Sequence, residues 1–150
     1  MSTANTSQIF SRIASIQWGA ADGNGGTGGP LLTANTARDG TGTVLTIFTS
    51  DATNGGLVNA VRARAVGTNT ASVLRVFINN GSTNATIANN VLWAEISLPA
   101  TTASAVAALA DVVLADPFFP LALPPGYKLN VTVGTTVAAG YFVSAAGGKY

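Results

Sequence analysis

Apolar residues recur in short runs along this chain, many of them at every second position, and Gly, Asn, Thr and Pro residues separate the runs. A period of two places successive side chains on opposite faces of a strand, whereas apolar positions on a helix recur with a period of about 3.6. The pattern therefore predicts an all-β fold, a jelly-roll-like antiparallel β-sandwich of about eight strands. The expected strands are 9–18, a short piece at 31–32, 43–50, 57–66, 72–79, 91–98, a segment within 105–123, 127–133 and 140–146.

The segment TTASAVAALADVVLA, residues 101–115, carries the most ambiguous pattern. Its alanines also suit a helix, because alanine has the highest intrinsic helix propensity. Pro117 and Pro120 follow closely, and the rest of the chain has strand periodicity. We therefore expect strand or irregular structure here, with a helical turn as the alternative.

The runs 57–66 and 72–79 are joined by Gly67-Thr68-Asn69-Thr70, which predicts a β-hairpin centred between Asn69 and Thr70. A hairpin in this register has one face of small and apolar side chains, which we assign to the core. The predicted pairs on that face are Ala65 with Leu74, Ala63 with Val76, and Val61 with Ile78.

The other face of the predicted hairpin carries Arg62, Arg64, Arg75 and Phe77. Arg64 lies directly across from Arg75 in this register, and like charges in that position destabilise a sheet. An acidic group or another surface should therefore cover them.

The run 91–98 supplies that acid. Its alternation directs Leu92, Ala94, Ile96 and Leu98 to the core and directs Trp93 and Glu95 outward, so Glu95 would lie between the arginines.

Arginine and aromatic residues with few other charges are typical of protein interfaces. We therefore predict an intermolecular surface that combines the face of this sheet with the start of the first expected strand. The alternative is that the first strand, or the glycine-rich segment after it, folds back and covers this face within one chain. The candidate interface residues are Arg62, Arg64, Arg75, Phe77, Trp93, Glu95, Ile9 and Phe10.

The amino-acid composition excludes several kinds of catalytic site, metal site and partner. The chain has no cysteine and no histidine, which removes disulfides, thiolate and imidazole catalysis, and most zinc-type sites. Only 9% of its residues are charged and the net charge is +1, so it lacks the basic surplus by which nucleic-acid binders neutralise phosphates. We expect no nucleic-acid partner.

The stretch DGNGGTGGPLL, residues 22–32, contains a G-x-G-x-x-G motif. A dinucleotide site needs a helix after that motif, because the pyrophosphate binds at the helix N-terminus. Pro30 and another turn-rich stretch follow instead, so we expect a flexible connector and no cofactor. An irregular calcium site on Asp22 and Asn24 is the alternative, although the spacing does not fit an EF-hand loop.

Few combinations of residues in this sequence could form a catalytic site. Serines are plentiful, but a Ser-His-Asp triad cannot form without histidine. Asp111 and Asp116 are the closest pair of acids for glycoside hydrolysis, and nothing in their surroundings predicts burial. We therefore expect a protein that is not an enzyme, with a hydrolase using these two acids as the least favoured alternative.

The first residues, MSTANTSQIF, lack the charged and apolar regions of a secretion signal, and no apolar run is long enough for a membrane helix. We expect a protein made in a cytoplasm, with no membrane partner. Two parts are predicted: residues 1–30 as an N-terminal arm with a first strand and a glycine-rich loop, and residues 31–150 as the β-sandwich domain.

Residues 35–81, NTARDGTGTVLTIFTSDATNGGLVNAVRARAVGTNTASVLRVFINNG, carry a family resemblance together with LWAEISLPATT (92–102), LALPPGYKLNVTVGT (121–135) and the closing SAAGGKY. In these stretches the chain resembles a set of small virion proteins of tailed bacteriophages, over about three quarters of its length. The resemblance implies a jelly-roll or related β-sandwich, often trimeric, that decorates or cements capsids. It brings no active-site motif, so no functional residue is carried over.

The resemblance leads us to expect a capsid decoration or cement protein. It would bind the phage major capsid protein as a homo-oligomer, expected as a homotrimer, on the capsid surface of a virion assembled in the bacterial cytoplasm. The alternative is a head-fibre, tail or baseplate module that binds a host glycan or a partner virion protein, with Trp93 or Trp18 stacking on a sugar ring.

Overall fold

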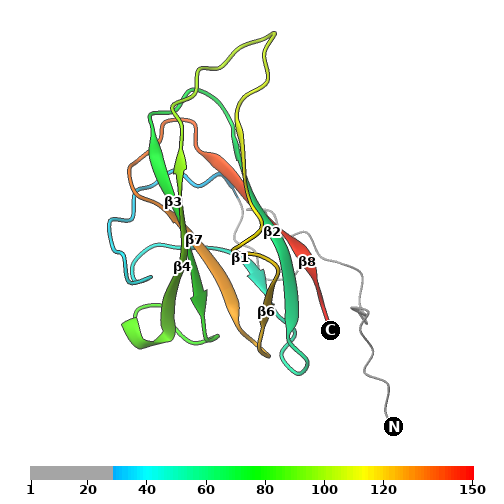
Figure 1. Cartoon of the computed structure of the whole chain (residues 1–150). Helices are drawn as coiled ribbons and strands as arrows, with labels where there is room; N and C mark the ends of the chain where they lie inside the picture. Colours follow the sequence, from blue (N-terminus) through cyan, green and yellow to red (C-terminus); the bar gives the residue numbers. More distant parts are fainter. Residues whose placement is uncertain (1–28) are drawn as a thin grey trace.

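The computed structural model describes residues 29–150, which form eight strands and one short 3-10 helix (Figure 1). The expected strand 9–18 with Ile9 and Phe10, Trp18, and the proposed calcium ligands Asp22 and Asn24 lie outside the described residues. The elements are β1 (Leu45–Thr49), β2 (Gly56–Ala65), β3 (Ser72–Asn79), η1 (Ile87–Asn89), β4 (Asn90–Leu98), β5 (Asp111–Leu114), β6 (Leu121–Leu123), β7 (Lys128–Val133) and β8 (Tyr141–Lys149).

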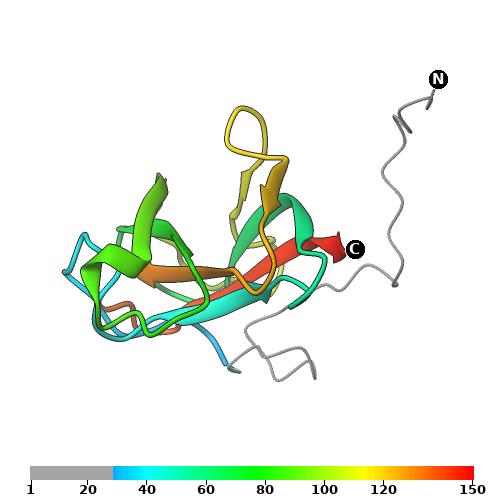
Figure 2. The same ribbon diagram turned by 90° about the horizontal axis from the view of Figure 1, so that it is seen from below.

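The strands form two antiparallel sheets that pack as a sandwich (Figure 2). One sheet, called here the β3 sheet, has the order β1-β7-β3-β4. In the other, the β2 sheet, β8 pairs along one edge of β2, and β6 and β5 pair one after the other along its opposite edge. The all-β prediction is confirmed, and 101–115 contains a strand, β5, after an irregular stretch.

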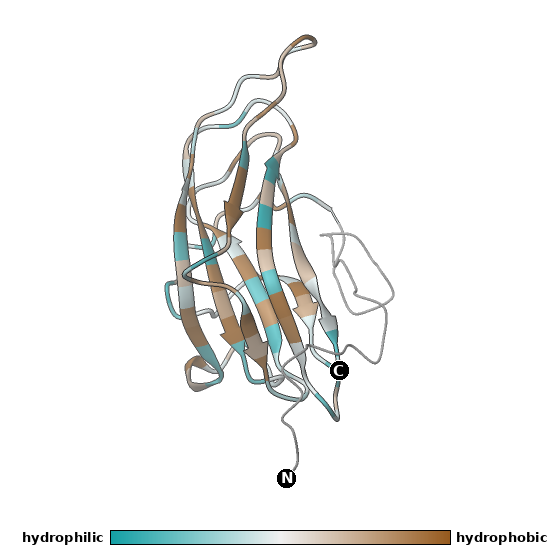
Figure 3. Cartoon of the chain, turned by 45° about the vertical axis from the view of Figure 1, so that its right-hand side comes forward, coloured by the Kyte–Doolittle hydropathy of each residue, from teal (hydrophilic) through white to brown (hydrophobic). Residues whose placement is uncertain are grey.

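Alternation along the strands produces the core. Val61 and Ala63 of β2, Leu74 and Val76 of β3 and Val131 of β7 are fully buried in one hydrophobic cluster. Figure 3 shows hydrophilic and hydrophobic residues alternating along the strands, as the period of two predicts. Burial of these inward side chains is the main term that stabilises the sandwich.

The predicted hairpin between 57–66 and 72–79 is wrong. β2 and β3 lie in different sheets: β2 pairs with β5, β6 and β8, and β3 pairs with β4 and β7. Val61, Ala63 and Ala65 therefore meet the β3 sheet across the core rather than along a strand pair, and Arg64 is not opposite Arg75. The connection between the strands crosses from one layer to the other, and its Asn69 is buried and hydrogen-bonds to Thr101 and Gly140.

The outer face of the β3 sheet is covered within the chain by residues 35–43. Arg75 is 8% exposed, and its Nη1 donates to the backbone oxygen of Asn35 at 3.0 Å. Phe77 is buried against Gly40, which has φ +81° and no room for a side chain beside Asn90. The intermolecular prediction is thus wrong for Arg75 and Phe77. A segment of the same chain covers them, although it is neither of the two segments considered from the sequence.

A β-bulge in β4 changes which side chains face inward. Val76 pairs with Ala94 and Phe77 pairs with Leu92, so Trp93 is the additional residue. Ala94, Ile96 and Leu98 pack in or against the core as predicted. Leu92 does not pack in the core, because it lies beyond the bulge and the alternation is shifted there, and its side chain is exposed.

The two lateral sides of the sandwich differ. β1 lies beside β8 on one side (Figure 2). Because β4 is at the far edge of the β3 sheet and β5 and β6 are at the far edge of the β2 sheet, these three strands share the opposite side. The described chain begins on the β1/β8 side, where Leu31 and Tyr141 exchange backbone hydrogen bonds of 2.8 and 3.1 Å.

Candidate interaction surfaces

The predicted interface residues that the structure describes fall on two separate parts of the molecule. Arg62 and Arg64 lie on the outer face of β2. The other four belong to β3 and β4 of the other sheet, where Arg75 and Glu95 pair in register: Arg75, Phe77, Trp93 and Glu95. They do not form one surface, because the sequence-based register placed β2 and β3 side by side.

The first surface, called here the β2 outer face, consists of Arg62, Arg64, Val113 and Phe142. Arg64 pairs in register with Phe142 of β8, and Arg62 pairs with Val113 of β5. Phe142 is 45% exposed and Val113 is 53% exposed. No other described element lies over this face, in contrast to the covered face of the β3 sheet.

The charges of this face are unevenly paired. Arg62 forms a bidentate ion pair with Asp111, whose pKa is held below its usual value mainly by that hydrogen bond. Among the described residues, no ion pair or side-chain hydrogen bond holds Arg64, although it also lies beside Asp111. The β2 outer face therefore presents a guanidinium that can bind an acceptor from outside.

A second cluster joins Arg38, Arg75 and Glu95. Arg38 Nη2 donates to both Glu95 carboxylate oxygens at 2.8 and 3.0 Å, and Arg75 Nε donates to Oε1 at 2.8 Å. These hydrogen bonds, from Arg38 first and then Arg75, lower the pKa of Glu95. Glu95 does lie between two arginines, as predicted, but the second is Arg38, which lies in an irregular segment without a periodic pattern to reveal it. The cluster fastens the covering segment to the sheet.

The third surface, the β4 edge patch, consists of Val91, Leu92, Trp93 and Phe118. Val91 is 59% exposed, and Leu92 and Trp93 are each 38% exposed. The Trp93 indole N–H donates to the backbone oxygen of Phe118 at 3.0 Å, which links β4 to the β5–β6 loop of the other sheet. The patch is an apolar strip at an open sheet edge.

The loop at 102–110 projects beyond the ends of the sheets (Figure 1). Its tip is apolar, and Val106 is 97% exposed. Ser104 Oγ accepts the backbone N–H groups of Val106 and Ala107 at 3.2 and 3.1 Å, so the tip has a defined turn.

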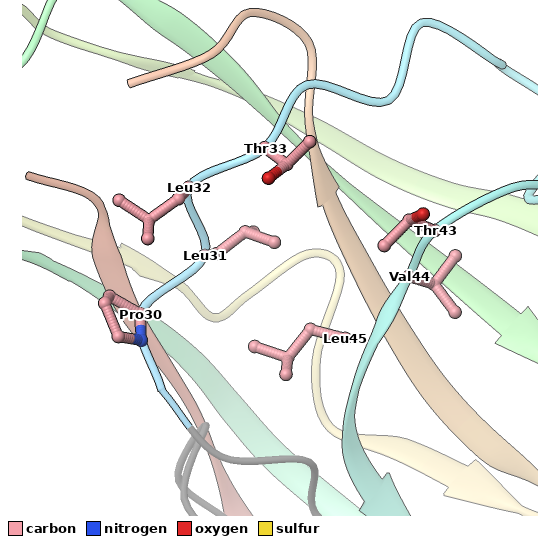
Figure 4. Close-up of a pocket in the computed structure, with 7 residues that line it drawn as sticks. All are labelled: Pro30, Leu31, Leu32, Thr33, Thr43, Val44 and Leu45. Atoms are coloured by element: carbon pink, nitrogen blue, oxygen red, sulfur yellow. The ribbon is translucent and has the colours of Figure 1, made fainter. Parts of the chain in front are cut away.

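A depression of about 250 Å³ lies where the described chain begins (Figure 4). It is open, and most of its lining is apolar; the side-chain polar atoms are the hydroxyls of Thr33 and Thr43. Ligand pockets usually combine an apolar lining with several convergent polar groups, which this one lacks. Its lining residues are Pro30, Leu31, Leu32, Thr33, Thr43, Val44 and Leu45.

Within residues 29–150, no group of three or more acidic residues could hold a metal ion. Asp111 and Asp116, the candidate hydrolase acids, are both exposed. A general acid at neutral pH needs a raised pKa, whereas the pKa of Asp111 is lowered. In the same part of the chain, no helix has the length and apolar character to cross a membrane. No protein-family model, curated protein or solved structure matches the chain.

Proposed function

We propose that this chain is a non-enzymatic structural protein of a phage virion, a capsid decoration or cement protein that binds the major capsid protein as a homo-oligomer. The observation that carries the proposal is the β2 outer face, which exposes Phe142 and Val113 beside Arg64 and is left uncovered by the described residues. Aromatic and arginine side chains in a flat apolar setting are the groups that interfaces enrich.

The two sheets support the jelly-roll form of the proposal. Five of the seven connections between successive strands cross from one sheet to the other, and only β3–β4 and β5–β6 connect strands of the same sheet. Two four-stranded antiparallel sheets with crossing connections are typical of jelly rolls, which capsid proteins use. The resemblance of residues 35–81 to small phage virion proteins agrees with this fold.

The proposed contact with the capsid combines an apolar surface with one positive charge. Phe142 and Val113 supply apolar area, and Arg64 supplies a cation that no described ion pair neutralises. We expect a carboxylate of the major capsid protein to lie against Arg64, because a guanidinium binds a carboxylate with two parallel hydrogen bonds. The remaining expectations, a trimer on the capsid surface that assembles in the host cytoplasm, belong to the same proposal.

The test is co-sedimentation of the full-length protein with emptied capsids. Arg64→Glu should weaken binding at least about tenfold, because it places a carboxylate opposite a carboxylate. Lys128→Glu makes the same charge change on the other sheet and should leave binding within about threefold. Equal binding of wild type and Arg64→Glu would contradict the proposed contact, and wild-type protein that neither binds capsids nor oligomerises would contradict the proposed function.

A second candidate is a fibre, tail or baseplate module that binds a glycan. The exposed ring of Trp93 favours it, since an aromatic face can stack on a sugar. The indole N–H is already donated to Phe118, so stacking would have to supply the affinity. A glycan array with no binding, or a Trp93→Ala variant with unchanged host attachment, would argue against this candidate.

A further inference from the structure

The loop at 102–110 contains the longest run of exposed residues in the described chain. Residues 102–108 are all exposed, and Val106 at the tip is 97% exposed. Among the described residues, no backbone–backbone hydrogen bond involves 102–109. The tip is shaped instead by Ser104 Oγ, which accepts the N–H groups of Val106 and Ala107. The backbone of this tip is therefore free to pair with a groove that binds an extended chain.

Both ends of the loop are fixed to the sandwich. Thr101 exchanges backbone hydrogen bonds of 2.9 and 3.0 Å with Asn69. At the other end, the Ala65 N–H donates to the oxygen of Ala110 at 3.5 Å, and β5 begins at Asp111. The tip can therefore become extended while its two anchors and both sheets keep their hydrogen bonds.

The side chains of the tip favour one class of enzyme. Residues 103–108 read Ala-Ser-Ala-Val-Ala-Ala, and such small side chains fit the small S1 pocket of elastase-type serine proteases. Trypsin, which needs a Lys or Arg, has no site here, because the chain carries neither between Arg75 and Lys128. The tip thus has both the accessibility and the composition of an elastase substrate.

The connection 80–89 offers a direct contrast. It is also largely exposed and also contains small residues, such as Ala85. Its backbone is tied, however: the Asn80 N–H donates to the Asn89 oxygen at 3.0 Å, and Asn84 Nδ2 donates to two backbone oxygens of the segment that covers the β3 sheet, at 3.2 and 2.7 Å. A protease would have to break backbone hydrogen bonds here and none in the loop.

We propose that the loop is a site of limited proteolysis for endoproteases with a small S1 pocket, with the cut between residues 103 and 109. Hydrolysis adds one water across a peptide bond, so the carbonyl carbon is released as a carboxylate and the nitrogen as an amine. The two new charges lie at an exposed tip, where water solvates them, and the cut protein keeps its fold. The cut does not depend on the proposed function, because the loop carries no residue of the β2 outer face.

The order of the strands explains why the two fragments stay together. A cut in the loop separates β1–β4 from β5–β8. Of the six strand pairs in the described residues, five join a strand of the first fragment to a strand of the second. The exception is β3–β4, which lies within the first fragment. Neither sheet is complete in one fragment, and the hydrophobic cluster takes side chains from both.

The first test is digestion of the native full-length protein with elastase, followed by mass spectrometry and size-exclusion chromatography. Within residues 29–150, the first cut should fall between residues 103 and 109. The two fragments should elute together as one species and separate only in denaturant. No cut, or a first cut in 80–89 or inside a strand, would overturn the proposed site. Fragments that elute apart without denaturant would overturn the proposed association.

A second test separates backbone freedom from residue type. Val106→Arg and Val91→Arg each place a trypsin site at an exposed position, 97% exposed in the loop and 59% exposed in β4. Val91 pairs with Ile78 of β3, so its strand has to open before trypsin can bind it. Trypsin should cut after residue 106 at least about tenfold faster than after residue 91, with the wild-type digest as the baseline. A smaller difference, or no cut after residue 106, would overturn the inference.

Discussion

The side chain of Asn69 and the backbone of Gly140 exchange two hydrogen bonds, as two strand residues would. Asn69 Oδ1 accepts the Gly140 N–H at 2.8 Å, and Asn69 Nδ2 donates to the Gly140 oxygen at 3.1 Å. Oδ1 also accepts the N–H of Ala139 at 2.8 Å. One buried side chain thus holds the β2–β3 connection against the start of β8.

Replacement of Asn69 by Ala should lower the free energy of unfolding by about 2–4 kcal/mol, since it leaves several buried backbone groups without a partner. Urea unfolding measures the change. Thr70→Ala, at the adjacent exposed position, is the control and should change stability by less than about 0.5 kcal/mol. Similar stability of Asn69→Ala and wild type would mean that water replaces the lost bonds.

Replacement of Thr132 should raise the free energy of unfolding, unlike replacement of Asn69. Its hydroxyl is buried without a hydrogen-bond partner among the described residues, and the residue lies opposite Arg75 in the β3 sheet. Thr132→Val removes an unsatisfied polar atom and should raise the free energy of unfolding by about 1 kcal/mol. Thr46→Val is the matched control, because the Thr46 hydroxyl donates to Asn130 at 2.7 Å, and it should reduce stability.

Glu95 predicts a pH dependence. Its pKa in the folded protein lies below the ordinary value of 4.5, so its ion pairs stabilise the fold fully above that value. The contribution is lost as the pH falls through the lowered pKa, where the carboxylate becomes protonated. Glu95→Gln should therefore be less stable than wild type at pH 7 and equal to it in strong acid.

Thermal unfolding at a series of pH values checks this expectation. Arg38→Gln removes the larger cause of the lowered pKa, so it should move the loss of stability toward higher pH. A difference between Glu95→Gln and wild type that stays constant from pH 7 to strong acid would contradict the role of the ion pairs.

Gly147 predicts a steric effect. A Cβ at this position would lie 2.1 Å from the Leu57 backbone oxygen and 2.9 Å from Val58 Cα, both in β2. Gly147→Ala should therefore destabilise the protein by about 1–3 kcal/mol, because backbone has to move. Ala146→Ser, at the exposed neighbouring position, should change stability by less than about 0.5 kcal/mol in the same denaturation measurement.

The sequence predicted the strands well and their partners poorly. Val61 and Ala63 alternate with Arg62 and Arg64 whether β2 pairs with β3 or faces it across the core, because both arrangements bury the same side chains. Alternation therefore cannot distinguish a hairpin from two opposite layers. Asn69 has the sequence context of an ordinary turn residue, and only the structure shows that it is buried.

The candidate surfaces were also predicted only in part, because alternation along a strand gives exposure but not strand partners or bulges. Exposure of Arg62, Arg64 and Trp93 followed from alternation and is confirmed. Leu92 was misplaced because a bulge leaves no periodic signature. Phe142 was not singled out as an interface residue, because its exposure depends on β8 pairing with β2, a contact between segments far apart in the chain.

The placement of β7 and β8 affects how this protein is made. β7 lies between β1 and β3, and β8 pairs along β2, so each sheet is completed by one of the last two strands. Among the described strand pairs, β3–β4 joins strands that follow one another in the chain, and the others join strands far apart in sequence. Pairing between distant segments folds slowly. The sandwich cannot close before β7 and β8 have left the ribosome. A nascent chain therefore presents a complete β2 outer face only after β8 has emerged.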